Sequence, residues 1–330
     1  MKQFNRYMII EPSSDNRLPK VGVSACLIGR NVRYDGGHKR DMFIADVLDK
    51  HVYLIPICPE LAIGLGVPRE TIQLIGDHQR PRLVGVSDHN HDITDIMESY
   101  ADAQSNQLNE LCGYILKKDS PSCGIEQVKV YSKDGKQFKR RGRGIFARIL
   151  MEHHPFIPIE EELQLSNATG RENFVNRIYV LQRWYTMLHN GLSPAQLQEF
   201  HTIHKYLVMA HSQTGYRRLG KLIANQSGQD MDSLSKSYIC GLMSALRHRA
   251  NRGSHSNVLQ YIMGYLKKRI SHDEKVGLSA SIDSYRRGET PLSAPINLLK
   301  YYIRFHPDEY LQKQVYLQPY PDIIGLRNTI

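Results

Sequence analysis

Three of the five cysteines share a local setting that would bring their thiols together. Cys26, Cys58 and Cys123 each stand just past a short apolar run, and glycine or proline residues flank each of them. If the three runs are parallel strands, their carboxyl ends meet at one edge of a sheet, where ligands bind in open α/β folds. Thiols that are 32 and 65 positions apart in the chain then converge on one point. Tight turns also bring backbone N–H groups close to the sulfurs, and these are donors that clusters and anions accept.

The spacing leaves three chemistries open for this trio. Three thiolates that hold a metal or an iron–sulfur cluster leave one coordination position open for a Lewis-acid role. A single nucleophilic cysteine with a base is the second option, and packing as small buried apolar side chains is the third. A structural zinc site is disfavoured because the sequence has no paired Cys-x-x-Cys motif. Cys112 and Cys240 fall inside expected helices, and we predict that both belong to the core.

The elements that would position these thiols follow from the apolar periodicity. Residues 21–26, 52–57 and 113–117 are apolar enough for buried strands, whereas residues 41–50 and 93–112 carry apolar positions at helical spacing. Strands that alternate with helices predict an α/β fold, with an open parallel sheet and crossover helices.

The pattern changes near residues 152–165, a segment that holds two prolines and the acidic run Glu160–Glu162. We expect two domains there, residues 1–158 and residues 159–330, and the second should be all-α. We expect the tail, residues 307–330, to be irregular and packed on the surface. Helical periodicity recurs at residues 171–190, 195–211, 233–250, 255–270, 273–287 and 291–305.

Composition excludes several classes of protein. With 41% hydrophobic and 23% charged residues in a chain of 330, the protein is neither wholly disordered nor collagen-like. No run approaches the ~20 apolar residues that span a bilayer, so we expect no membrane association. The polar start of the chain lacks the apolar core of a signal peptide, and sparse cysteines are typical of a reducing compartment. We therefore expect a cytoplasmic protein.

The positive charge is concentrated in the second half of the chain. Residues 1–160 carry 22 basic and 20 acidic side chains, a net +2, whereas residues 161–330 carry 21 and 13, a net +8. A basic domain beside a near-neutral one is typical of nucleic-acid binding, although a solvated basic surface has the same composition. No G-x-G-x-x-G or Walker motif is present, so we expect no nucleotide cofactor. Candidate phosphate-binding residues in the first half are Lys139, Arg140, Arg141 and Arg143.

Four motifs, taken in order, resemble the thiouracil desulfurase family over about residues 20–160. They are Val-Gly-Val-Ser-Ala-Cys-Leu-Ile-Gly (21–29), Arg-Tyr-Asp-Gly-Gly (33–37), Pro-Ile-Cys-Pro-Glu (56–60) and Ser-Pro-Ser-Cys-Gly (120–124). The remainder is similar to the helical domain of YbgA-type proteins, through Arg-Glu-Asn-Phe (171–174), His-Lys-Tyr (204–206), Ala-His-Ser (210–212) and Tyr-Pro (320–321). The fused arrangement resembles tRNA 4-thiouridine desulfidases. The resemblance implies a [4Fe-4S] cluster on Cys26, Cys58 and Cys123 with the fourth iron open, and tRNA as the partner.

With such a cluster, we expect the thiocarbonyl sulfur of 4-thiouridine to bind the open iron and water to attack C4. Uridine and hydrosulfide then form without net redox change. Water activation needs a general base, and Glu60, two residues after Cys58, is the first candidate, followed by Asp35. Candidates for orienting water or the pyrimidine, and for stabilising negative charge, are Ser24, Ser120, Ser122 and Lys117.

These residues also have structural interpretations, and the whole chain has competing functions. Asp35 stands before two glycines, where it is often a turn residue, and the serines bond readily to the local backbone. Glu60 would suit a helix N-terminus, and Lys117 would suit an ion pair with Asp119. The competing functions are desulfuration of free thiouracil and an RNA-binding module with a structural metal site. A fourth protein ligand, such as Cys112, would favour the structural role. The sequence makes no prediction of the oligomeric state.

Overall fold

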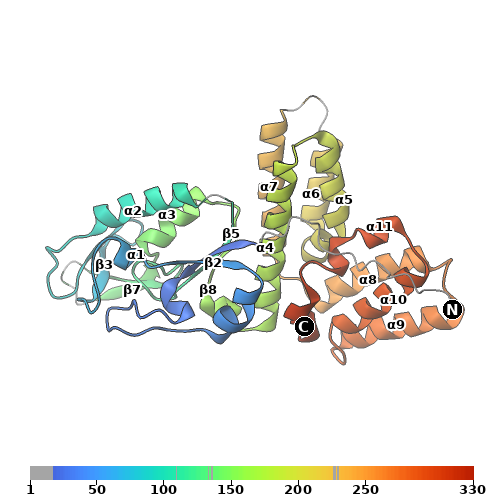
Figure 1. Cartoon of the computed structure of the whole chain (residues 1–330), viewed down its shortest axis with the longest axis horizontal. Coiled ribbons are helices and arrows are strands. Elements are labelled where there is room, and N and C mark those ends of the chain that lie inside the picture. The colour runs from blue at the N-terminus through green and yellow to red at the C-terminus, as the bar shows by residue number, and fades with distance from the viewer. Residues whose placement is uncertain (1–17, 109, 133, 135–136, 226–227, 229) are drawn as a thin grey trace, which may run out of the picture.

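The computed structural model describes residues 18–330 apart from residues 109, 133, 135–136, 226–227 and 229. Its first part contains two four-stranded sheets, and its second part is built from helices (Figure 1). The long helix α4 (Ala168–His189) stands between the two parts. The predicted architecture, an α/β domain followed by an all-α domain, is confirmed.

The first sheet is parallel throughout and contains all three predicted strands. Its order is β2 (Tyr53–Ile57), β1 (Lys20–Ser24), β5 (Leu111–Leu116) and β8 (Ile159–Glu161). Every residue of β5 is buried, which is typical of a central parallel strand that is covered on both faces. This burial explains the continuous apolar run in the sequence.

Short helical segments follow the strands of this sheet. A 3-10 turn (Ala25–Ile28) follows β1, and the single-turn helix α1 (Pro59–Ala62) follows β2. Two longer helices, α2 (Thr94–Gln107) and α3 (Ile145–His153), pack against each other on one side (Figure 1). Because these segments follow parallel strands, the loops after β1 and β2 lie together at the carboxyl ends of the strands.

Two of the predicted helices differ from the structure. The segment at 41–50 is a π-helical turn and then a 3-10 turn, Phe43–Val47 and Leu48–Lys50. The helix predicted over 93–112 ends at Gln107 because β5 begins four residues later. Cys112 is therefore buried in a strand rather than in a helix.

The sequence does not predict the second sheet. Its order is β4 (Pro81–Gly85), β3 (Ile72–Gly76), β6 (Val128–Tyr131) and β7 (Phe138–Gly142). β3 pairs with β6 in parallel, while each outer strand is antiparallel to its neighbour. Four of the five β7 residues are exposed, so the alternation that marks a half-buried strand is missing from its sequence.

Over the described residues, the second domain contains the six predicted helices and two more, α6 and the short α11. Most begin at an Asn, Ser or Asp whose side chain accepts an N–H from the first turn. After α4 the helices are α5 (Pro194–His211), α6 (Gln213–Ala224), α7 (Met231–Arg247), α8 (Arg252–Leu266), α9 (His272–Arg287), α10 (Ser293–Phe305) and α11 (Glu309–Gln312).

Two expectations for this domain are wrong. Cys240 is exposed on α7 rather than part of the core. The tail is not merely a surface segment: it forms short helical turns and buries Tyr316, Leu326 and the side chain of Arg327. No helix of the described chain combines the length and the apolar character needed to cross a membrane.

Helix α4 joins the two domains through close contacts with the first domain. The Tyr179 hydroxyl donates a hydrogen bond of 2.8 Å to the carbonyl of His51. At Gly113 in β5, an added Cβ would lie 2.7 Å from the side chain of Ile178. The absence of a side chain at Gly113 therefore permits this approach of helix and strand.

Candidate functional site

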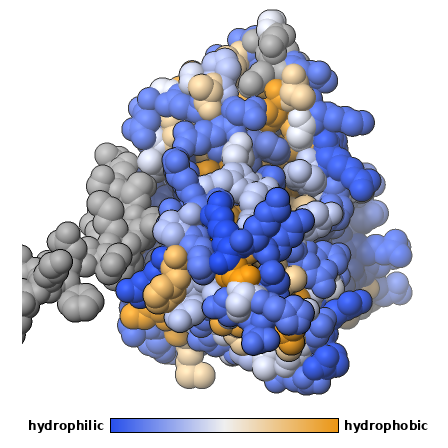
Figure 2. Space-filling view, turned by 90° about the vertical axis from the view of Figure 1, so that its right-hand side faces the viewer, coloured by the Kyte–Doolittle hydropathy of each residue, from blue (hydrophilic) through white to orange (hydrophobic). Residues whose placement is uncertain are grey.

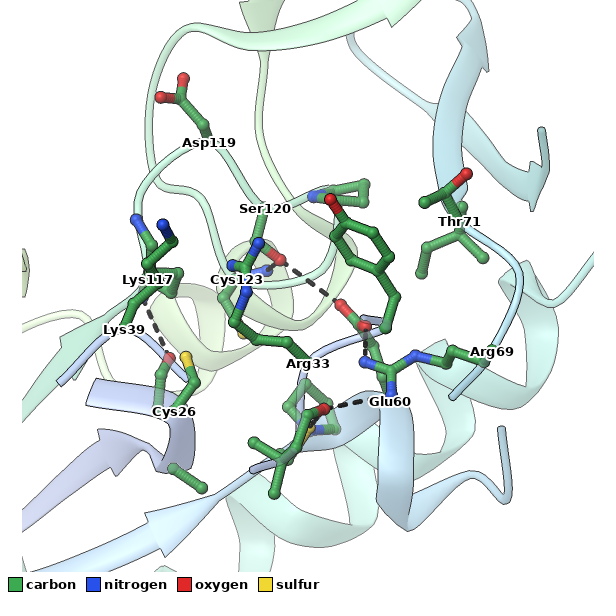
Figure 3. A pocket seen from close by; sticks show the side chains of 18 of the residues that line it. Cys26, Arg33, Lys39, Glu60, Arg69, Thr71, Lys117, Asp119, Ser120 and Cys123 are labelled. Carbon is green, nitrogen blue, oxygen red and sulfur yellow. Dashed lines mark hydrogen bonds and ion pairs between the residues drawn. The ribbon is translucent and has the colours of Figure 1, made fainter. Parts of the chain in front are cut away.

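A cavity of about 360 Å³ lies where β1, β2 and β5 end (Figure 3). Cys26, Cys58 and Cys123 all line it, the first and third buried and Cys58 partly exposed. Within the described residues, no three His, Cys, Asp or Glu side chains lie close enough to share one metal ion. The thiols are thus spread around one cavity and do not meet at a single-ion site.

A different turn positions each cysteine. Cys26 lies in a 3-10 turn that ends at Gly29, whose φ of +91° favours glycine. Cys58 is the N-cap residue of α1. The N–H of Cys123 donates to Ser120 Oγ at 3.1 Å. These turns follow three adjacent strands, which is why residues far apart in sequence reach one cavity.

Burial raises the pKa of all three thiols. For Cys26 the pKa rises to about 11, mainly through burial and then through the neighbouring Cys58. For Cys123 burial acts first and Glu60 second, while a hydrogen bond from the Ser24 hydroxyl acts in the opposite direction. Without a cation these groups are neutral thiols, but a bound metal reverses the preference because it stabilises the thiolate.

Glu60 is fixed in the cavity wall by three side chains. Its Oε1 accepts from Ser122 Oγ at 2.9 Å and from Ser120 Oγ at 3.5 Å. Its Oε2 forms an ion pair with Arg69, which also donates to the carbonyls of Val32 and Gly66 (Figure 3). The Glu60 side chain is 15% exposed and that of Arg69 5%. The pair is therefore largely withdrawn from water, and the carboxylate has one orientation.

Removing Arg69 should destabilise the fold because it leaves the Glu60 carboxylate buried without its counter-ion. We expect Arg69→Met to lower the free energy of unfolding by about 3 kcal/mol, measured by urea denaturation of the unloaded chain. Arg40→Met is the matched control, since Arg40 pairs with Asp46 at an exposed site and its loss should change the stability little. Equal stability of the two variants would contradict this account of the Glu60 pair.

Ser24 and Lys117 also line the cavity, but each has structural partners. The Ser24 hydroxyl accepts from the N–H of Lys117 at 3.0 Å. The Lys117 ammonium pairs with Glu162 and donates to the carbonyl of Lys118. The ion pair of Lys117 with Asp119, which the sequence left open, does not form. Asp119 pairs instead with Arg140, at 3.2 Å.

Two candidates lie outside the cavity lining. Asp35 is exposed; its carboxylate accepts from the N–H of Gly37 and lies 3.5 Å from Arg33. The Gly37 hydrogen bond lowers the pKa of Asp35, which is the behaviour of a turn residue. Ser122 is fully buried behind Glu60 and orients its carboxylate.

The predicted phosphate-binding residues divide into two groups. Lys139, Arg140 and Arg141 lie on the exposed strand β7, where Arg140 stands next to the cavity through its pair with Asp119. Arg143 instead donates to the carbonyl of Ile125 at 3.0 Å, which fixes the chain just after the third cysteine.

Sequence reasoning missed the other cations of the cavity wall, which are Arg33, Lys39, Arg69 and Lys118. Arg33 and Lys39 stand in the charged loop after Cys26, and its dense basic residues were the available signal. Nothing in the sequence marks Arg69 as the partner of Glu60, because a loop with no periodic pattern separates the two.

Comparisons with known proteins match the two parts of the chain to different families. Residues 21–162 match the 2-thiouracil desulfurase family, and residues 205–321 match a family described as "Protein of unknown function (DUF1722)". The uncharacterized protein YbgA of Escherichia coli (strain K12) is 37% identical over 154 residues, which cover 46% of this chain and 91% of YbgA. The uncharacterized protein YbbK of Bacillus subtilis (strain 168) is 33% identical over 148 residues, 43% of this chain and 95% of YbbK.

One solved structure is similar to part of the chain. It is described as a [4Fe-4S]-dependent thiouracil desulfidase, TudS, and is 29% identical. The match covers 44% of this chain and 92% of TudS, with a TM-score of 0.36.

Proposed function

We propose a desulfidase function for this chain, which belongs to the 2-thiouracil desulfurase family through residues 21–162 and carries a YbgA-type helical domain. The substrate we propose is 4-thiouridine in tRNA, which is converted to uridine with release of sulfide. The observation that carries the proposal is the single cavity lined by three cysteines, a fixed carboxylate and several cations.

The donor set fits a [4Fe-4S] cluster bound by Cys26, Cys58 and Cys123. An iron–sulfur cluster distributes its cysteine ligands over several irons, and the three thiols here line one cavity from three separate turns. Burial raises the pKa of all three thiols, so they would give up their protons only on ligation, when a bound metal stabilises the thiolate. A cluster with three protein ligands supplies a Lewis acid that polarises the thiocarbonyl group.

Glu60 is the general base in this proposal. Arg69 and Ser122 fix its carboxylate in the cavity wall, so it is oriented to take a proton from the attacking water. The overall reaction exchanges a carbon–sulfur double bond for a carbon–oxygen double bond and turns water into hydrogen sulfide, with no change in electron count. The Lys117 ammonium at the same cavity lowers the cost of negative charge that develops on the substrate.

The charges around the cavity favour a substrate that carries phosphates. Arg33, Lys39 and Lys118 line the cavity, and Arg140 lies beside it. Cations so placed bind the sugar–phosphate backbone of RNA. The helical domain adds to this, since residues 161–330 carry a net +8. Figure 2 shows that the outer end of this domain is mainly hydrophilic.

Free thiouracil is the second candidate substrate. The cavity volume of about 360 Å³ is sufficient for a single base and falls within the range of small-molecule sites. The family matched by residues 21–162 is also named for this substrate.

A comparison of substrates decides between the two. We expect the anaerobically reconstituted chain to show a higher kcat/KM for 4-thiouridine tRNA than for free 4-thiouracil, because only the tRNA gains the phosphate contacts. The tRNA value should fall steeply between 50 and 200 mM salt, on the order of 10-fold or more, because phosphate contacts are lost. Equal kcat/KM values with no salt dependence would contradict the tRNA proposal and support the free base.

A further inference from the structure

The acidic run Glu160–Glu162 lies where the two domains meet, and each of its carboxylates has a separate partner. Glu160 pairs with Arg177 of helix α4. Glu162 pairs with Lys117 and accepts from the N–H of Lys118 at the cavity. The middle carboxylate, Glu161, is directed to the turn that carries the third cysteine.

Glu161 closes the end of that turn. Its Oε1 accepts from the N–H of Ile125 at 2.8 Å and from the N–H of Glu126 at 3.5 Å, two and three residues beyond Cys123. The Glu161 residue is only 7% exposed. Burial raises its pKa, while the bond from Ile125 acts in the opposite direction.

A buried carboxylate is a costly way to satisfy two backbone groups. A charged acceptor must be withdrawn from water, which a neutral acceptor avoids. In return its hydrogen bonds are about twice as strong as those of a neutral group. The strong hydrogen bonds of Glu161 therefore offset the cost of burying its charge. They hold the segment immediately after Cys123 in place.

The turn also has contacts with Glu60, which accepts from Ser122, with Arg143, which donates to the carbonyl of Ile125, with its own serine and with the start of α3. Ser120 Oγ accepts from the N–H of Cys123, and the N–H of Gly144 donates to the carbonyl of Gly124 at 2.8 Å. An added Cβ at Gly144 would lie 2.4 Å from the backbone of Ser122, so helix and turn are in direct contact. Glu161, on strand β8, holds the N–H of Ile125 at the end of this turn.

We propose that Glu161 is a positioning residue for Cys123: it holds the third cysteine in the orientation that a bound cluster needs. The inference rests on the proposed function in one respect, that Cys123 is a cluster ligand. Residues that orient metal ligands typically account for 10–100-fold in metal affinity, although they do not touch the metal. Glu161 has this type of position, because it bonds to the backbone next to Cys123 and not to the cysteine itself.

The test compares Glu161→Ala and Glu161→Gln with wild type in the full chain. After anaerobic loading with iron and sulfide, iron release to an excess of an iron(II) chelator should be about 10–100-fold faster for Glu161→Ala. Glu161→Gln should lie between the two, because its amide oxygen still accepts from Ile125. Glu152→Gln, which removes an exposed carboxylate on α3, should match wild type.

A second measurement needs no cluster. In the unloaded chain, hydrogen exchange over residues 119–126 should rise in Glu161→Ala while exchange in β1 and α2 stays unchanged. A general loss of stability would raise exchange in all three segments and would count against a positioning role. If Glu161→Ala does not fold, Glu161→Gln carries both measurements.

The outcomes separate this inference from the proposed function. Wild-type iron release and wild-type exchange in both Glu161 variants would overturn the inference. If wild type itself takes up no iron, the cluster proposal fails, and the exchange over residues 119–126 still decides whether Glu161 orders the turn.

Discussion

Cys58→Ala is expected to abolish both cluster binding and desulfuration. The three cysteines line one cavity from three different turns, so the loss of one leaves a cluster with only two of its three protein ligands. We expect iron and acid-labile sulfide to fall to background after anaerobic reconstitution. Sulfide release from the thiolated substrate should fall by at least about 10³-fold, because the Lewis acid is lost with the cluster.

Cys240→Ser is the control for this result. Cys240 is exposed on α7 in the helical domain, so its replacement removes a thiol without touching the cavity. The control should keep wild-type iron content and rate. Full iron content and activity in Cys58→Ala would show that these cysteines are not the ligands.

Glu60→Gln is expected to reduce kcat strongly while the cluster stays bound. The amide keeps the shape of the side chain, and its oxygen can still accept from Arg69, while its NH2 group can donate to Ser122. The variant loses the charge of the ion pair and cannot accept a proton from water. General acid–base catalysis contributes about 10²–10⁴-fold, so we expect a loss of kcat in that range with KM changed little. Visible absorbance and iron content, measured on the same sample, should equal those of wild type.

Asp46→Asn provides the comparison for Glu60. Asp46 is also paired with an arginine, Arg40, but lies outside the cavity lining, and its variant should keep the wild-type kcat. A Glu60→Gln kcat within about twofold of wild type would remove Glu60 from the proton transfers. The base would then have to be sought among the other groups of the cavity.

The convergence of the cysteines was predictable because it depends on a local pattern and one topological rule. Each thiol follows an apolar run, and parallel strands place their carboxyl ends side by side. The pattern is strong in β5, where every residue is buried. It fails for β7, whose exposed Phe-Lys-Arg-Arg sequence is typical of a solvated loop. The sequence pattern therefore does not predict the second sheet. Its strand β7 nevertheless places Arg140 beside the cavity, where Arg140 pairs with Asp119.

The roles of the individual polar residues depended on tertiary contacts that sequence spacing does not encode. Glu60 and Asp35 are both carboxylates in turns, yet Arg69 and two serines fix one in the cavity wall while the other bonds to its own turn. Glu161 appeared only as part of an acidic run near a domain boundary. The proposed role of Glu161 depends on the pairing of β8 with β5, because this pairing places Glu161 beside the N–H of Ile125.

The most direct test of the central claim is an anaerobic reaction in ¹⁸O-labelled water. The iron-loaded chain is incubated separately with 4-thiouridine tRNA and with free 4-thiouracil, and both the sulfide and the ¹⁸O content of the product base are measured. We predict one ¹⁸O at C4 for each sulfide released, and no reaction without iron. If the iron-loaded chain leaves the sulfur of both substrates in place, the chain is not a desulfidase of this kind.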